Sequence, residues 1–148
     1  MGIKAVTNRQ VLVNQEIQLD HIHSQQKTIP TLADSIILTG GVPAWTLGSK
    51  TQIVATDQIS NDFDIHYIGL GVVSEVATVY EIQFFAGEIG QEVLIGTIRA
   101  FRQSNQAGTS PIPIMTPKLP AGTRISAACA TGNGGSDTIA IAIFYHEY

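Results

Sequence analysis

The chain has 148 residues, which fits one domain with a self-sufficient hydrophobic core. Charged residues make up 14% of it, below the usual share of about 25%, and eight lysines and arginines are scattered along a chain of net charge −4. Such a chain has no basic stripe to neutralise phosphates, so we expect no nucleic-acid partner. No apolar run reaches membrane-spanning length, and the start MGIKAVTNRQ lacks the apolar stretch of a secretory signal. We therefore expect a protein made in the cytoplasm, with no membrane partner.

Residues 1–30 are predicted to form an extended N-terminal arm, and residues 31–148 a separate folded domain. The first segment contains five glutamines and no aromatic residue, so it offers little to a core of its own. Its apolar positions suit the addition of a strand to the exposed sheet edge of a partner. The alternative is an ordinary edge strand followed by a loop. The residues that would contact the partner are Val11, Val13, Ile17 and Leu19.

The sequence HIH places His21 and His23 on one side of an extended segment, a common way to offer two imidazoles to a metal ion. Cupins, which are β-barrels, use a similar motif followed closely by a glutamate. Here the following residues are SQQKT, which contain no acid, and no second histidine motif appears later. We therefore expect no metal and no cofactor.

After Pro30 the chain is predicted to be all-β, because β-branched and aromatic runs alternate with turn residues and no helical period is sustained. About eight strands at this spacing indicate a jelly-roll-like antiparallel β-sandwich, with a small barrel as the alternative. The expected strands are residues 34–39, 51–56, 63–73, 78–86, 92–102, 110–116, 123–130 and 137–148.

Two of these strands show which side faces the core. In TVYEIQFF, strand alternation puts Tyr80, Ile82 and Phe84 on one face, which we expect to be buried. In the last strand both faces are largely apolar, so it is predicted to be central or covered on both sides. The dipeptide Asn133-Gly134 favours a tight reversal and predicts that the last two strands form a hairpin.

The single tryptophan, Trp45, lies in the turn-rich segment TGGVPAWTLGS. Small neighbours let the backbone approach a flat ring, so we expect Trp45 to be an anchor under a loop or across a subunit contact. It could instead close one open end of the sandwich, or form a platform on which a sugar stacks.

The remaining polar residues do not predict a reaction centre. Asp62 and Asp64 precede a strand, as turn residues do, and His66 and His146 lie beside aromatics as half-buried packing residues do. Cys129 has small apolar neighbours, which indicates a buried, inert thiol. No nucleophile elbow or phosphate-binding loop is present, so we expect the protein not to be an enzyme.

The C-terminal sequence FYHEY concentrates aromatic residues where most domains fray. One interpretation is that Phe144, Tyr145 and Tyr148 dock against a neighbouring subunit. The other is that the last strand completes the core and Tyr148 caps it. Sparse charge across the whole chain is also typical of proteins whose exterior is covered by partners.

From residue 35 onward, six segments follow one another: TGGVPAWTLGS, FDIHYIGLGV, VYEIQFFAG, IGTIRAFR, IPIMTPKLPAGTRISAACAT and DTIAIAIFYHEY. In the style and order of these segments, the chain resembles small jelly-roll or β-sandwich virion proteins of tailed bacteriophages that decorate capsids. The resemblance implies a homotrimer on the capsid exterior that cements subunits of the major capsid protein, made in the host bacterial cytoplasm, with no catalytic residue. A carbohydrate- or receptor-binding tip of a tail fibre or baseplate is the alternative, and a metal-dependent barrel enzyme is a third hypothesis.

Overall fold

The computed structural model describes residues 25–31, 35–103 and 111–148. These residues form strands without any helix, so none of them belongs to a helix that could cross a membrane. The eight predicted strands are all present, most ending within two residues of their expected bounds. The strands are β1 (Lys27–Ile29), β2 (Ile36–Thr39), β3 (Thr51–Val54), β4 (Phe63–Val73), β5 (Thr78–Ala86), β6 (Val93–Arg102), β7 (Pro111–Pro113), β8 (Ile125–Thr131) and β9 (Thr138–Glu147).

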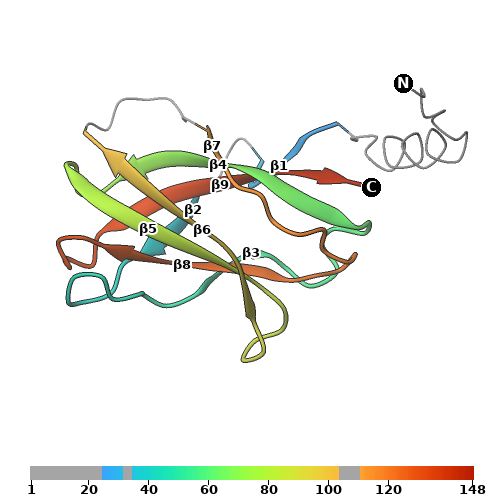
Figure 1. Ribbon diagram of the computed structural model, residues 1–148, viewed down its shortest axis with the longest axis horizontal. Coiled ribbons are helices and arrows are strands. Elements are labelled where there is room, and N and C mark those ends of the chain that lie inside the picture. Colours follow the sequence, from blue (N-terminus) through green and yellow to red (C-terminus); the bar gives the residue numbers. More distant parts are fainter. Residues whose placement is uncertain (1–24, 32–34, 104–110) are drawn as a thin grey trace, which may run out of the picture.

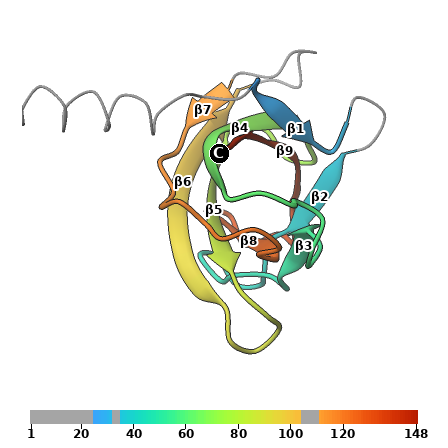
Figure 2. The ribbon, with the colours of Figure 1, turned by 90° about the vertical axis from the view of Figure 1, so that its right-hand side faces the viewer.

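The strands form two antiparallel sheets that pack face to face (Figure 1). Sheet A has the order β1-β9-β4-β7, and β2 pairs with β9 on the same side as β1; sheet B has the order β3-β8-β5-β6. Figure 2 shows the sheets enclosing the core, with β6 and β7 adjacent at one corner and β2 and β3 at the other.

The pairing scheme is that of a jelly roll. Strand β2 pairs with β9, β3 with β8, β4 with β7 and β5 with β6, so the chain is one long antiparallel hairpin rolled into two sheets. This confirms the predicted jelly-roll-like sandwich. Strand β1 is additional: it lies within the range assigned to the arm, and it pairs with residues 143–145 of β9.

The prediction of a C-terminal hairpin is wrong. Strand β8 lies in sheet B, where it pairs with β3 and β5, whereas β9 lies in sheet A. Gly134 does adopt a positive φ of 73°, as the turn chemistry suggested, but the reversal carries the chain across from one sheet to the other. Local turn residues determine that the chain reverses; they do not determine which strand the next segment pairs with.

The core fills the space between the sheets with apolar side chains. From sheet B, Tyr80, Ile82 and Phe84 are fully buried, as predicted. From sheet A, β9 contributes alternate residues and lies centrally between β4 and the β1–β2 edge, which confirms the prediction for that strand. Cys129 is also fully buried, and burial raises the pKa of its thiol to about 11, as expected of an inert thiol.

Candidate association surface

The outer face of sheet A is assembled by strand alternation from residues whose neighbours point into the core. In the register of β4 and β9, Gly69 lies opposite Ala142 and Tyr67 opposite Phe144, while Leu70 and Ile68 point inward. The outward positions of this sheet between its two ends include Thr28, Ile37, Tyr67, Gly69, Gly71, Pro111, Pro113, Ala140, Ala142 and Phe144.

Small residues form the floor of this face, and larger apolar side chains border it. A Cβ at Gly69 would come within 2.9 Å of Cε2 of Phe144, so the ring of Phe144 lies directly against the Gly69 backbone. A Cβ at Gly71 would come equally close to Ala140. The rim includes Tyr67, which is 39% exposed. A hollow of about 470 Å³ lies here, lined by Gln26, Tyr67, Pro111 and Phe144.

The charged residues of the described strands of sheet A lie at one end of the sheet. The charged residues of the five strands of sheet A are Lys27, Asp64 and Glu147, and their register places them together where β4 begins and β9 ends. Lys27 and Glu147 lie opposite the inward-facing Tyr145 and Phe63, so both extend from the inner side of the sheet at its end, where they form an ion pair of 2.8 Å between Nζ and Oε1. Among the described strands, Asp64 is therefore the one charged residue on the outer face, and the rest of this face is uncharged, the composition found at the centres of protein interfaces.

The predicted C-terminal interface residues occupy three different environments. Phe144 points outward on the face just described. Tyr145 points inward, is 7% exposed and packs edge-to-face against Phe63. Tyr148 closes on its own chain: its hydroxyl donates to Oδ2 of Asp64 at 2.7 Å, and its amide donates to the carbonyl of Asp62 at 2.9 Å. The position of Tyr148 fits the cap interpretation.

Of the other predicted interface residues, Trp45 alone lies within the part of the chain that the structure describes. Val11, Val13, Ile17 and Leu19 lie outside the described residues, as do His21 and His23. Trp45 lies on the other side of the molecule, beside the outward-pointing Arg99 of sheet B, whose guanidinium is 5.3 Å from the centre of its ring. It is 51% exposed and has a φ of 61°, which is rare for a bulky residue. Its ring packs against Gly132.

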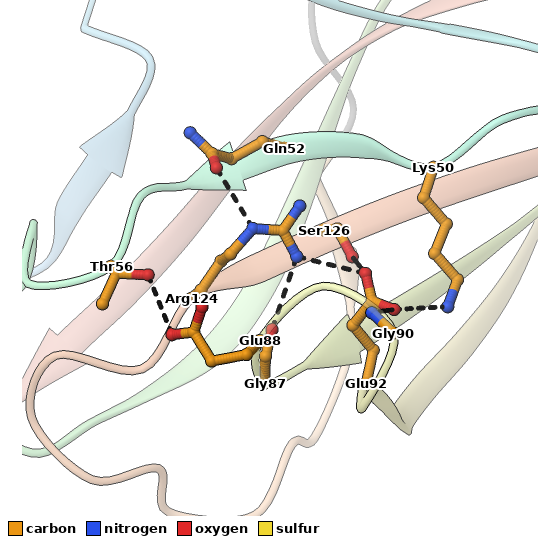
Figure 3. Close-up of polar contacts among 9 residues, drawn as sticks. All are labelled: Lys50, Gln52, Thr56, Gly87, Glu88, Gly90, Glu92, Arg124 and Ser126. Atoms are coloured by element: carbon orange, nitrogen blue, oxygen red, sulfur yellow. Dashed lines mark hydrogen bonds and ion pairs between the residues drawn. The ribbon is translucent and has the colours of Figure 1, made fainter.

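A buried arginine that the sequence analysis missed organises one end of sheet B (Figure 3). Arg124 is 7% exposed, and its Nη1 pairs with Oε1 of Glu92 at 3.1 Å, while its Nε donates to Gln52. Lys50 binds the other oxygen of Glu92 at 3.0 Å. The hydrogen bond from Lys50, together with those from Gly90 and Arg124, lowers the pKa of Glu92 to about 2. Because these groups satisfy one another, the network fastens the β5–β6 turn to β3 and β8.

Three side chains that the sequence analysis treated separately meet at the charged end of sheet A. Asp64 lies opposite His146 in the register of β4 and β9, and His66 follows on the same strand. The potential ligand atoms of these residues all lie within 4.8 Å of one another, and each residue is half-buried. The antiparallel pairing of FDIHY with FYHEY was the available signal, but it appears only once β4 is known to pair with β9.

Comparison with known proteins finds no matching family model and no matching curated protein. Among solved structures, the chain is similar to a chain in the structure of infectious bursal disease virus Gt strain, with 11% sequence identity and a TM-score of 0.38. The similarity covers 86% of this chain and 38% of the viral chain. The assignment of the fold therefore rests on the strand order of the chain itself.

Proposed function

We propose that the chain is a non-enzymatic structural protein of a virion: a capsid decoration protein that assembles as a homotrimer and cements neighbouring subunits of the major capsid protein. The observation that carries the proposal is the uncharged outer face of sheet A, with its floor of small residues and its exposed aromatic rim. Jelly rolls serve as viral capsid, lectin and cupin domains. Of these roles, an apolar outer face favours the one that depends on association between proteins, as in a capsid.

The shape of this face suits close contact with another protein. Small side chains at Gly69, Gly71 and Ala142 let a partner backbone approach the sheet, and Tyr67 and Phe144 provide rings that can be buried at the rim. Each square ångström of apolar surface removed from water stabilises the contact by about 25 cal/mol. A stable specific interface buries roughly 800 Å² on each partner.

Ala142→Asp tests the proposal by placing a charge at the centre of the face. The matched control is Thr97→Asp, at an exposed, outward position on β6 of sheet B. We expect wild-type protein and the Thr97 variant to elute with the mass of a trimer in light scattering and to sediment with capsids of the virus that encodes the chain. The Ala142 variant should lose trimer mass, capsid binding or both. An Ala142 variant that retains both would contradict the proposal.

A carbohydrate- or receptor-binding tip of a tail fibre or baseplate is the second candidate, and Trp45 favours it. A half-exposed indole in a sparsely populated backbone conformation is a feature found at binding sites. Its neighbour Gly132 lines a hollow of about 510 Å³, together with Asn133 and residues 75–79. Quenching of tryptophan fluorescence by host-cell glycans, lost in Trp45→Ala, would support this function. A fibre tip would bind host cells and ignore capsids.

A further inference from the structure

We propose that Asp64, His66 and His146 form a binding site for a divalent transition-metal ion of the Zn²⁺ class, at the charged end of sheet A. Two imidazoles and one carboxylate are ligands that zinc and related ions accept in three-ligand protein sites. The site is distinct from the HIH motif of the N-terminal segment.

The strand geometry brings the ligands together. Asp64 and His146 are directly opposite on neighbouring strands, and both point to the outer face of sheet A. His66 lies in a β-bulge: Ile65 and Tyr67 pair with consecutive residues of β9, so His66 is the extra residue. A bulge redirects a side chain relative to regular alternation. In this case His66 shares a side of the sheet with Asp64, and its Nε2 lies 2.9 Å from Oδ1 of the carboxylate.

The distances need only small adjustment to enclose an ion. Ligand atoms that bind zinc tetrahedrally at about 2.0–2.2 Å lie about 3.4 Å from one another. The three ligand atoms here lie no more than 4.8 Å apart, and the rings of His66 and His146 are inclined at 74° with their centres 4.3 Å apart. The ligand atoms therefore have to approach one another by at most about 1.4 Å, a distance on the scale of a side-chain rotation.

The C-terminal tyrosine holds the carboxylate in place. The hydroxyl of Tyr148 donates to Oδ2 of Asp64 at 2.7 Å, which leaves Oδ1 on the side of His66. A hydrogen bond to a ligating carboxylate orients the ligand and strengthens metal binding. Lys118, 4.5 Å from the centre of the Tyr148 ring, covers this residue.

Access to the ligands is open on one side. Asp64, His66 and Tyr67 line a hollow of about 320 Å³ together with residues 113–116. With three protein ligands, a zinc ion keeps a fourth position for water or for a group from another molecule. The hollow provides room for that fourth ligand.

The test is calorimetric titration of ZnCl₂ into tag-free, EDTA-treated protein, with Co²⁺ absorption as a report on coordination. We expect one equivalent to bind to the wild type and to the His21→Ala/His23→Ala double variant. His146→Ala and the nearly isosteric Asp64→Asn should each weaken binding by at least about tenfold, and Tyr148→Phe by about 10–100-fold. Circular dichroism checks that each variant is folded. Absence of saturable binding to the wild type, or binding lost in the double variant and kept in folded Asp64→Asn, would overturn the proposal.

Discussion

Substitution by aspartate should affect the stability of the fold very differently at two neighbouring residues of β9, because Ile141 and Ala142 lie on opposite faces of sheet A. Ile141 is 2% exposed and lies between Ile36 of β2 and Leu70 of β4. Removing a buried isoleucine side chain costs about 2–5 kcal/mol. A carboxylate at this position has no partner among the apolar residues around it and adds several kcal/mol. The sum approaches or exceeds the total stability of about 5–15 kcal/mol of an ordinary domain, so Ile141→Asp should unfold the chain.

Ala142→Asp should leave the fold intact, because position 142 faces outward opposite Gly69. Its main cost is the low strand propensity of aspartate, about 1 kcal/mol, which corresponds to a decrease in Tm of about 2–4 °C for a domain of this size. Urea unfolding followed by circular dichroism measures both variants. We expect no cooperative transition for Ile141→Asp and a near-normal one for Ala142→Asp. The reverse order would refute the assignment of the two faces, and equal destabilisation would show that the outer face is covered within the single chain.

Four further outcomes are expected. Because the pKa of Glu92 is held at about 2, below its ordinary value of 4.5, its ionised form stabilises the fold above pH 4.5, and this contribution disappears as the pH falls towards 2. In urea titrations across that pH range, the free energy of unfolding should fall less steeply with decreasing pH for Glu92→Gln than for the wild type. Equal dependence on pH in the two proteins would contradict the assignment. Cys129 should resist a thiol reagent in native buffer and react fully in urea; rapid native labelling would mean that β8 is accessible. Gly69→Val should lower stability by about 1–3 kcal/mol by displacing the ring of Phe144, as measured by thermal unfolding, and the loss should be smaller when Phe144→Ala is also present. Deletion of residues 1–24, which keeps β1, should leave a folded trimer that sediments weakly with capsids; loss of the β-signal in circular dichroism would show that the arm is part of the core.

The sequence was sufficient to predict strands and faces wherever alternation was strong. In β5, the alternation of Tyr80, Ile82 and Phe84 with polar residues predicted both the strand and its buried side. Strand β1 escaped prediction because three residues in a glutamine-rich segment carry no period. It forms by pairing with β9, which is a tertiary interaction.

The features that depend on pairing between distant strands could not be predicted. The error about the last two strands arose because Asn133-Gly134 reports a reversal and says nothing of the sheet that follows. The grouping of Asp64 with His146 depends on register between segments about eighty residues apart in the chain. The network of Arg124 likewise joins β3, the β5–β6 turn and β8. Residue types alone contain no information on such contacts.

The location of the protein on the virus particle tests the central claim most directly. Electron microscopy of particles carrying a labelled copy of the chain, averaged over the head and separately over the tail, would show where it binds. We predict density on the outer surface of the head, arranged as trimers that bridge neighbouring capsid subunits. Density restricted to tail fibres or the baseplate, or absent from the particle, would contradict the account.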